Sequence, residues 1–191
     1  MKTIIFLALP LTLMSAFFTA SDPVAGDNLT DPRDGKIYKT VKIGDQVWMA
    51  QNLNYQLAET HASYCYKNSA SNCEKFGRLY DWENAKKACP NGWHLPSKEE
   101  WEKLISNYPD NETAYKNLIM GGASGFNATL HGVHSVADNQ FVTIKEHGAY
   151  WTSTDYNTER AWVQRFMLNS GDTYESQAIK VNGHACRCVK N

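Results

Sequence analysis

The chain of 191 residues is long enough for one globular domain of roughly 150 residues and a short additional segment. Apolar residues make up 42% and charged residues 20%, and 19 basic against 20 acidic residues give a formal net charge of −1. This balance, without any long charged block, excludes nucleic-acid binding and a polybasic membrane role. Only the extreme N-terminus is continuously apolar, which excludes a multispan membrane protein.

Residues 1–20 have the pattern of a secretory signal segment. Lys2 supplies a short positive region, residues 4–14 are apolar, and residues 15–20 supply small side chains. The alternative is an uncleaved anchor, because residues 4–20 approach the minimum length of a membrane span. We therefore expect a secreted or cell-surface protein that contacts a membrane only through this segment, if the segment stays uncleaved.

A linker and then a β-hairpin are predicted next. Residues 21–34 are polar and contain proline and glycine, which predicts a linker before a domain that covers residues 35–191. Polar and apolar residues alternate over residues 36–43, and a second β-rich run covers residues 46–53. The glycine-first dipeptide at positions 44 and 45 between these runs predicts a tight turn.

Two to three helices follow the hairpin. Residues 79–89 place their apolar side chains on one helical face, and Pro90 comes directly after them. Ser97 and Glu100 have the spacing of a capping box, which predicts a second helix up to about residue 106. Residues 112–120 predict a third.

The last third of the chain favours short strands. The clearest are residues 148–154, 160–168 and 183–189, and the glycines, asparagines and aspartates between them favour turns. A hairpin, then helices, then a run of strands predicts an α+β fold with a mainly antiparallel, twisted sheet.

All five cysteines lie after the signal segment, in the part of the chain that we expect to be exported, where disulfides persist. Cys65 and Cys73 bracket a polar loop, which predicts a local disulfide. Cys89 then has either Cys186 or Cys188 as its partner near the C-terminus. One thiol is left over, and a buried free cysteine on a strand is its simplest interpretation.

The residue types of catalytic and metal sites are not assembled along the sequence. His131 and His134 are three residues apart, but turn formers surround them and no Asp, Glu or Cys nearby completes a zinc site. The chain has no Gly-x-Ser-x-Gly motif and no glycine-rich phosphate loop. We therefore expect no catalytic residue, no metal site and no cofactor.

Six motifs occur in an order that resembles one known family. They are CEKFGRLYDW at residues 73–82, ACPNGWHLPS at 88–97, EW at 100–101, SGFNA at 124–128, YWTST at 150–154 and RCVK at 187–190. Together they resemble the Fibrobacter succinogenes major paralogous domain, which is found in secreted and surface proteins of Bacteroidetes-type bacteria. The resemblance covers about residues 31–191.

This resemblance implies a C-type lectin-like fold that is stapled by disulfides. In such domains the cysteine of the first helix bonds to a cysteine in the last strand, which assigns Cys89 to Cys188 and leaves Cys186 as the free thiol. The Glu-Pro-Asn and Trp-Asn-Asp triplets of sugar-binding C-type lectins are absent, which argues against calcium-dependent binding. The family is also similar to formylglycine-generating enzymes, which use a cysteine pair with copper, although their motif spacing is absent here.

Aromatic side chains in the late loops suggest a binding surface. Trp162, Tyr156 and Tyr174 lie in or beside loops rich in Asn, Thr, Asp and Gln, and Asp155 lies among them. Flat rings beside polar donors suit stacking on sugars or docking of a protein. We predict a non-catalytic recognition module for extracellular polysaccharide or a surface protein. The alternatives are a copper and thiol oxidoreductase of the formylglycine-generating type and a purely structural envelope protein.

Overall fold

The computed structural model describes residues 24–58 and 63–191, so the predicted signal segment at 1–20 lies outside the described residues. The helices are η1 (Tyr66–Asn68), α1 (Ala70–Phe76), α2 (Trp82–Ala88), α3 (Lys98–Ile105) and α4 (Asn111–Leu118). The strands are β1 (Val24–Ala25), β2 (Leu29–Thr30), β3 (Ile37–Tyr38), β4 (Thr40–Ile43), β5 (Gln46–Met49), β6 (Ser63–Tyr64), β7 (Leu79–Tyr80), β8 (Trp93–His94), β9 (Val133–Ser135), β10 (Gln140–Val142), β11 (His147–Asp155), β12 (Arg160–Met167), β13 (Asp172–Ile179), β14 (His184–Ala185) and β15 (Val189–Lys190). Within the described ranges, no helix is long and apolar enough to cross a membrane.

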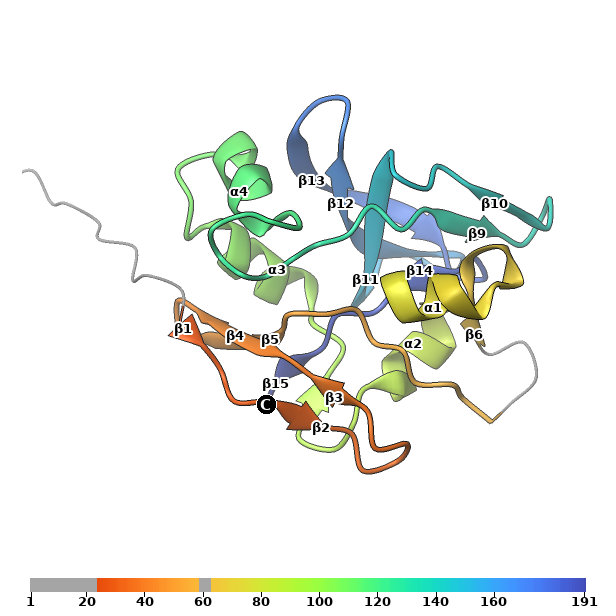
Figure 1. The fold of residues 1–191 in the computed structure, drawn as a ribbon. Coiled ribbons are helices and arrows are strands. Elements are labelled where there is room, and N and C mark those ends of the chain that lie inside the picture. The colour runs from red at the N-terminus through yellow and green to blue at the C-terminus, as the bar shows by residue number, and fades with distance from the viewer. Residues whose placement is uncertain (1–23, 59–62) are drawn as a thin grey trace, which may run out of the picture.

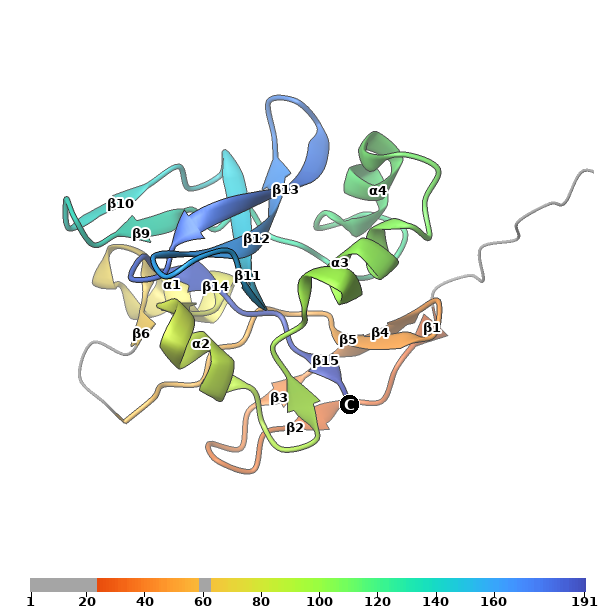
Figure 2. The same ribbon diagram turned by 180° about the vertical axis from the view of Figure 1, so that it is seen from behind.

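Two larger sheets organise the chain (Figures 1 and 2). One has six strands in the order β13-β12-β11-β14-β7-β6, and the other has five in the order β1-β4-β5-β15-β8. β2–β3 and β9–β10 form separate two-stranded sheets. The named strands pair antiparallel, except that β11 and β14 run parallel. The prediction of an α+β fold with mainly antiparallel pairing is therefore confirmed, but the described strands form several sheets rather than the one sheet that we expected.

The predicted hairpin forms between β4 and β5. Ile43 pairs with Gln46 across the two-residue turn, and Gly44 has a φ of +59°, which glycine adopts without the steric cost that a side chain would add. The described part of the expected linker does not lie apart from the domain: β1 pairs with β4, and β2 pairs with β3. Asp31 in this segment is fully buried, so residues 24–34 pack on the domain.

Side-chain caps set where the helices begin. The carboxylate of Asp81 accepts a hydrogen bond from the amide of Asn84 at 2.9 Å, and α2 therefore starts at residue 82. Residues 79–80, which we expected to be helical, form β7 instead. The capping box of Ser97 and Glu100 is present at the start of α3. The described residues contain four α-helices rather than the two or three expected, since the sequence did not predict α1.

The C-terminal segment passes from one sheet to the other. We expected one strand over residues 183–189, but β14 belongs to the six-stranded sheet and β15 to the five-stranded sheet. Residues 186–188 form the connection between them. The amide of Met49 donates to the carbonyl of Cys188 and that of Leu53 to the carbonyl of Cys186, so this connection runs beside the end of β5 and the residues that follow it.

Helices cover both faces of strand β12, and two hydrophobic clusters result. Phe166 belongs to the cluster around Trp101 of α3, while Ala161 and Val163 belong to the cluster around Trp82 of α2. In Figures 1 and 2, α3 and α4 lie beside β11–β13 at one end of the molecule, and α2 lies on the opposite side of the same sheet. The outer end of the β11–β12 hairpin remains exposed beyond these clusters.

Candidate functional site

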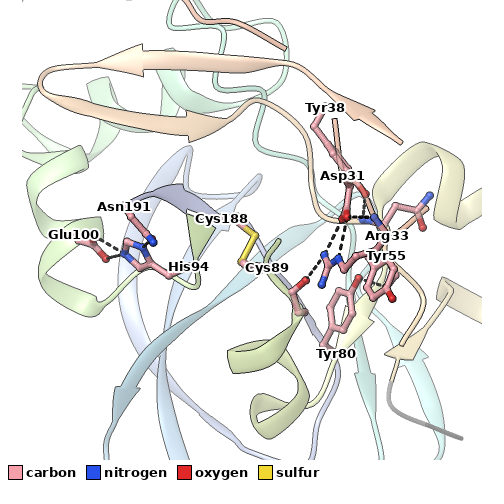
Figure 3. The surroundings of a disulfide bond; sticks show 12 residues. Asp31, Arg33, Tyr38, Tyr55, Tyr80, Cys89, His94, Glu100, Cys188 and Asn191 are labelled. Atoms are coloured by element: carbon pink, nitrogen blue, oxygen red, sulfur yellow. Dashed lines mark hydrogen bonds and ion pairs between the residues drawn. A yellow bond between two sulfur atoms is a disulfide. The ribbon is translucent and has the colours of Figure 1, made fainter. Parts of the chain in front are cut away.

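A disulfide joins the end of α2 to the residue before β15 (Figure 3). It links Cys89 to Cys188, with 5.9 Å between the two Cα atoms, as the family resemblance implied. Cys65 and Cys73 form the predicted local disulfide, and Cys186 is a free, buried thiol. Because Cys188 is bonded to Cys89, the chain in this state does not offer the two thiolates that a copper site at the C-terminal cysteines needs.

Polar contacts attach the N-terminal segment beside this disulfide (Figure 3). Arg33 donates from Nε and Nη2 to the carboxylate of Asp31, at 2.9 and 2.7 Å. Its Nη2 also donates to the carbonyl of Ala88 at 2.7 Å, next to Cys89, and its guanidinium lies 3.8 Å from the ring centre of Tyr55. These contacts place the segment that we expected to be a linker directly against the end of α2.

Tyr156 and Trp162 come together at the exposed end of the β11–β12 hairpin. Their ring centres are 5.3 Å apart and the rings meet edge to face at 86°. The turn between them is closed by the carbonyl of Arg160, which accepts hydrogen bonds from the amides of Tyr156 and Asn157. Tyr156 is 50% exposed and Trp162 is half-buried. We call these two residues the aromatic pair.

The other two predicted binding residues lie on the opposite side of the hairpin. Neighbouring residues along a strand point to opposite faces, and cross-strand partners share a face. Tyr174 pairs with Arg165, whereas Trp162 pairs with Gln177, so Tyr174 and Trp162 face opposite sides of the sheet. Asp155 forms an ion pair with Lys180, whose ammonium lies 4.3 Å from the ring centre of Trp82 in α2. The structure therefore does not bring Tyr174 and Asp155 to the aromatic pair.

Lys98 completes the surroundings of the aromatic pair, a role that we did not predict from the sequence. It is the first residue of α3, and its amide donates to Oγ1 of Thr154 at 3.0 Å, which fixes the start of the helix against β11. Its ammonium lies 5.1 Å from the ring centre of Trp162 and 2.8 Å from the carboxylate of Glu175. Hydrogen bonds from Lys98 to Glu102 and Glu175 raise its pKa, so it stays charged. Its position after the capping serine is the one sequence signal that could have indicated it.

A cleft continues from Lys98 along the same face of the sheet. It has a volume of about 430 Å³ and lies between the end of α3, the start of α4 and the strands β12 and β13. Its lining includes Glu102, Asp110, Gln164, Thr173 and Glu175, and the predicted binding residue Tyr174 also lines it. We call this the acidic cleft. Nothing in the sequence pattern predicted it, because it depends on how α3 and α4 pack on the two strands.

The histidines at positions 131 and 134 have structural contacts. His131 is buried, with its ring nitrogens 2.9 Å from the carbonyl of Thr129 and 3.0 Å from that of Ala149. The ring of His134 stacks on Phe141 at 4.4 Å between ring centres. In residues 24–58 and 63–191, no group of three or more His, Cys, Asp or Glu side chains is placed to hold a metal ion.

Comparison with known proteins gives one match. The family profile of the Fibrobacter succinogenes major domain matches residues 41–190, which include the aromatic pair, the acidic cleft and both disulfides. No curated protein and no solved structure matches the chain significantly.

Proposed function

The chain belongs to the Fibrobacter succinogenes major domain family, and from this premise we propose that it is an exported, non-catalytic recognition protein that binds polysaccharide through Tyr156 and Trp162. The observation that carries the proposal is the contact between these two rings at an exposed turn, beside the ammonium of Lys98. Aromatic faces stack on the apolar face of a sugar ring, and a neighbouring charged donor can bind its hydroxyl groups.

The C-type lectin-like fold remains part of this proposal. In support of it, a disulfide ties the end of α2 to the residue that directly precedes β15, the last described strand. That last strand, β15, pairs with β5 of the N-terminal hairpin, so the two ends of the domain lie in one sheet. The disulfide is the bond that the family resemblance implied, and the sheet pairing supports the proposal independently.

Export also belongs to the proposal. Two disulfides are typical of proteins that fold in oxidising compartments. The apolar pattern of residues 1–20 supplies a signal for that route. A surface or secreted location would give the protein access to extracellular polysaccharide.

Recognition is favoured over an oxidoreductase of the formylglycine-generating type. Such chemistry at the C-terminal cysteines requires two thiolates, but Cys188 is bonded to Cys89. Cys186 is fully buried, and burial raises the pKa of its thiol well above its ordinary value. A neutral, enclosed thiol is neither a nucleophile nor a metal ligand at neutral pH.

Binding to an array of bacterial and plant glycans tests the proposal. We expect Trp162→Ala and Tyr156→Ala to weaken binding of any recognised glycan by about tenfold or more, because each removes stacking area. Trp93→Ala is the matched control, since Trp93 is also half-buried but lies in the five-stranded sheet. Unchanged binding by both variants at the aromatic pair would contradict the proposal. Failure of the unmodified protein to bind any glycan would favour a structural role in the envelope.

A further inference from the structure

We propose that the acidic cleft binds the protonated amine of an amino sugar, so that the recognised polysaccharide contains unacetylated amino sugar units. This inference rests on the proposed function and names its ligand class. It is carried by an unpartnered carbonyl oxygen on a residue that lines the cleft, by the excess of carboxylates around the cleft, and by the continuity of the cleft with the aromatic pair through Lys98.

The unpartnered oxygen belongs to Gln164 of β12. Gln164 is 2% exposed and Thr173 is fully buried, and both line the cleft. Nε2 of Gln164 donates to the hydroxyl of Thr173 at 2.7 Å, and that hydroxyl donates to the carbonyl of Arg165 at 2.7 Å. The hydroxyl proton is thus already used, which fixes the orientation of the Gln164 amide.

With this orientation, Oε1 of Gln164 has no hydrogen-bond partner among the described residues. A buried carbonyl oxygen without a donor destabilises the folded protein, and native proteins rarely retain one without a reason. A ligand that donates an N–H or O–H inside the cleft would remove this cost. The cleft is therefore suited to a ligand that donates hydrogen bonds.

The charges of the residues that line the cleft indicate the charge of its ligand. Glu102, Asp110 and Glu175 line the cleft, and no Lys or Arg does. Lys98, at its edge, is the basic residue that contacts two of these carboxylates, Glu102 and Glu175. Asp110 caps α4 by accepting from the amide of Thr113 at 2.7 Å, which leaves its carboxylate ionised. Three carboxylates and one ammonium leave an excess of negative charge, which attracts a cation and repels an acidic sugar.

The cleft and the aromatic pair can contact one ligand because they share Lys98. The ammonium of Lys98 lies over the ring of Trp162 and also contacts the carboxylate of Glu175 inside the cleft. A sugar unit stacked on Trp162 therefore has the acidic cleft next to it. A neighbouring unit with a protonated amine would supply both the positive charge and the N–H donor that the cleft lacks.

Calorimetric titration of the purified protein with two matched oligomers tests this inference. One is a soluble β-1,4-linked glucosamine oligomer, and the other is the N-acetylated oligomer of the same length, each at a pH below the pKa of the free amine. We expect the amine form to bind about tenfold more tightly or better. Asp110→Asn, which keeps a good helix cap but removes the charge, and Gln164→Met, which removes the acceptor, should each reduce this preference about threefold or more. Asp138→Asn, at an exposed position in the β9–β10 turn, is the control that should leave the preference unchanged.

The outcomes separate the two proposals. Equal affinity for both oligomers, with binding still lost in Trp162→Ala, would overturn the amine site and keep the polysaccharide proposal. Binding of neither oligomer, while the array shows another glycan that depends on Trp162, would overturn it in the same way. Tighter binding of a short lysine peptide than of the glucosamine oligomer would overturn the sugar assignment in favour of a protein ligand. A thermal melt of each variant verifies that lost binding does not reflect unfolding.

Discussion

Arg187 donates hydrogen bonds from Nε and Nη2 to the side-chain oxygen of Asn52, at 3.1 and 2.5 Å. It also donates to the main-chain carbonyls of Met49, Phe126 and Asn127, and its guanidinium lies 4.6 Å from the ring centre of Phe126. The guanidinium is fully buried, and no carboxylate of the described residues forms an ion pair with it. Arg187 therefore joins the connection between the two sheets to the segment after β5 and to the loop at residues 126–127.

We expect Arg187→Lys to destabilise the protein by at least about 3 kcal/mol. Lysine offers a compact ammonium in place of the planar fork, so several of the five hydrogen bonds are lost and buried acceptors stay unpaired. Urea unfolding measures the change in the free energy of unfolding. The matched control is Arg160→Lys at an exposed position, which should change it by less than about 0.5 kcal/mol. Equal effects of the two substitutions would show that the hydrogen bonds of the buried guanidinium are not required for stability.

The two disulfides should differ in their contribution to stability. Cys89 and Cys188 are 99 residues apart in sequence and Cys65 and Cys73 are 8 apart. On the chain-entropy model, removing the long-range bond by paired Cys→Ser substitution costs about 4–5 kcal/mol, and removing the local one costs about 2–3 kcal/mol. Guanidinium unfolding of the two double variants checks this order. A larger loss from the local bond would mean that contacts within the native state, rather than loop closure, set the contribution of each bond.

The thiol of Cys186 should resist alkylation until the protein unfolds. The side chain is fully buried, so the reagent cannot reach the sulfur. Burial also raises the pKa of the thiol well above its ordinary value, so the reactive thiolate does not form. We expect mass spectrometry to show no iodoacetamide adduct on the native protein and one adduct after denaturation without a reductant. Peptide mapping should place that adduct on Cys186. An adduct on Cys188 would instead show that Cys186 is the partner of Cys89.

Local sequence signals predicted the parts of this fold that depend on neighbouring residues. The turn at Gly44 and the capping box of Ser97 and Glu100 each arise within a few residues, and both are present. The pairing of Cys89 with Cys188 came from the family resemblance rather than from spacing, because spacing allowed Cys186 equally well.

Features that depend on strand register could not be predicted in the same way. Tyr156, Trp162 and Tyr174 looked equivalent in the sequence, since all three lie in or beside polar loops. Which face each occupies is set by the register of β12 against β13 and by a register shift in β11 before Asp155. The acidic cleft could not be predicted either, because its walls come from helices as well as strands and it forms only where these elements pack together. Residue types alone therefore indicated aromatic candidates but not which of them share a surface.

Acid should destabilise the protein through its buried histidines. Burial lowers the pKa of His131 and of His147 to about 4, and Arg165 contributes to the lower value at His147. Burial also lowers the pKa of His184 well below its ordinary value. An unfolded histidine has a pKa near 6.5, so between that value and about 4 the unfolded chain binds more protons than the folded one. Stability is therefore full above about pH 6.5 and falls as the pH drops towards 4.

The expected loss is about 2 kcal/mol for each of His131 and His147 between neutral pH and about pH 5. Urea unfolding at a series of pH values measures it, and His147→Gln is the informative variant. Its amide oxygen can replace the ring nitrogen that lies 3.4 Å from Nη1 of Arg165, but glutamine does not titrate. The variant should thus lose about 2 kcal/mol less than the unmodified protein over the same pH range. The same pH dependence in both proteins would show that His147 takes up its proton in the folded state, so that its burial does not exclude the charged ring.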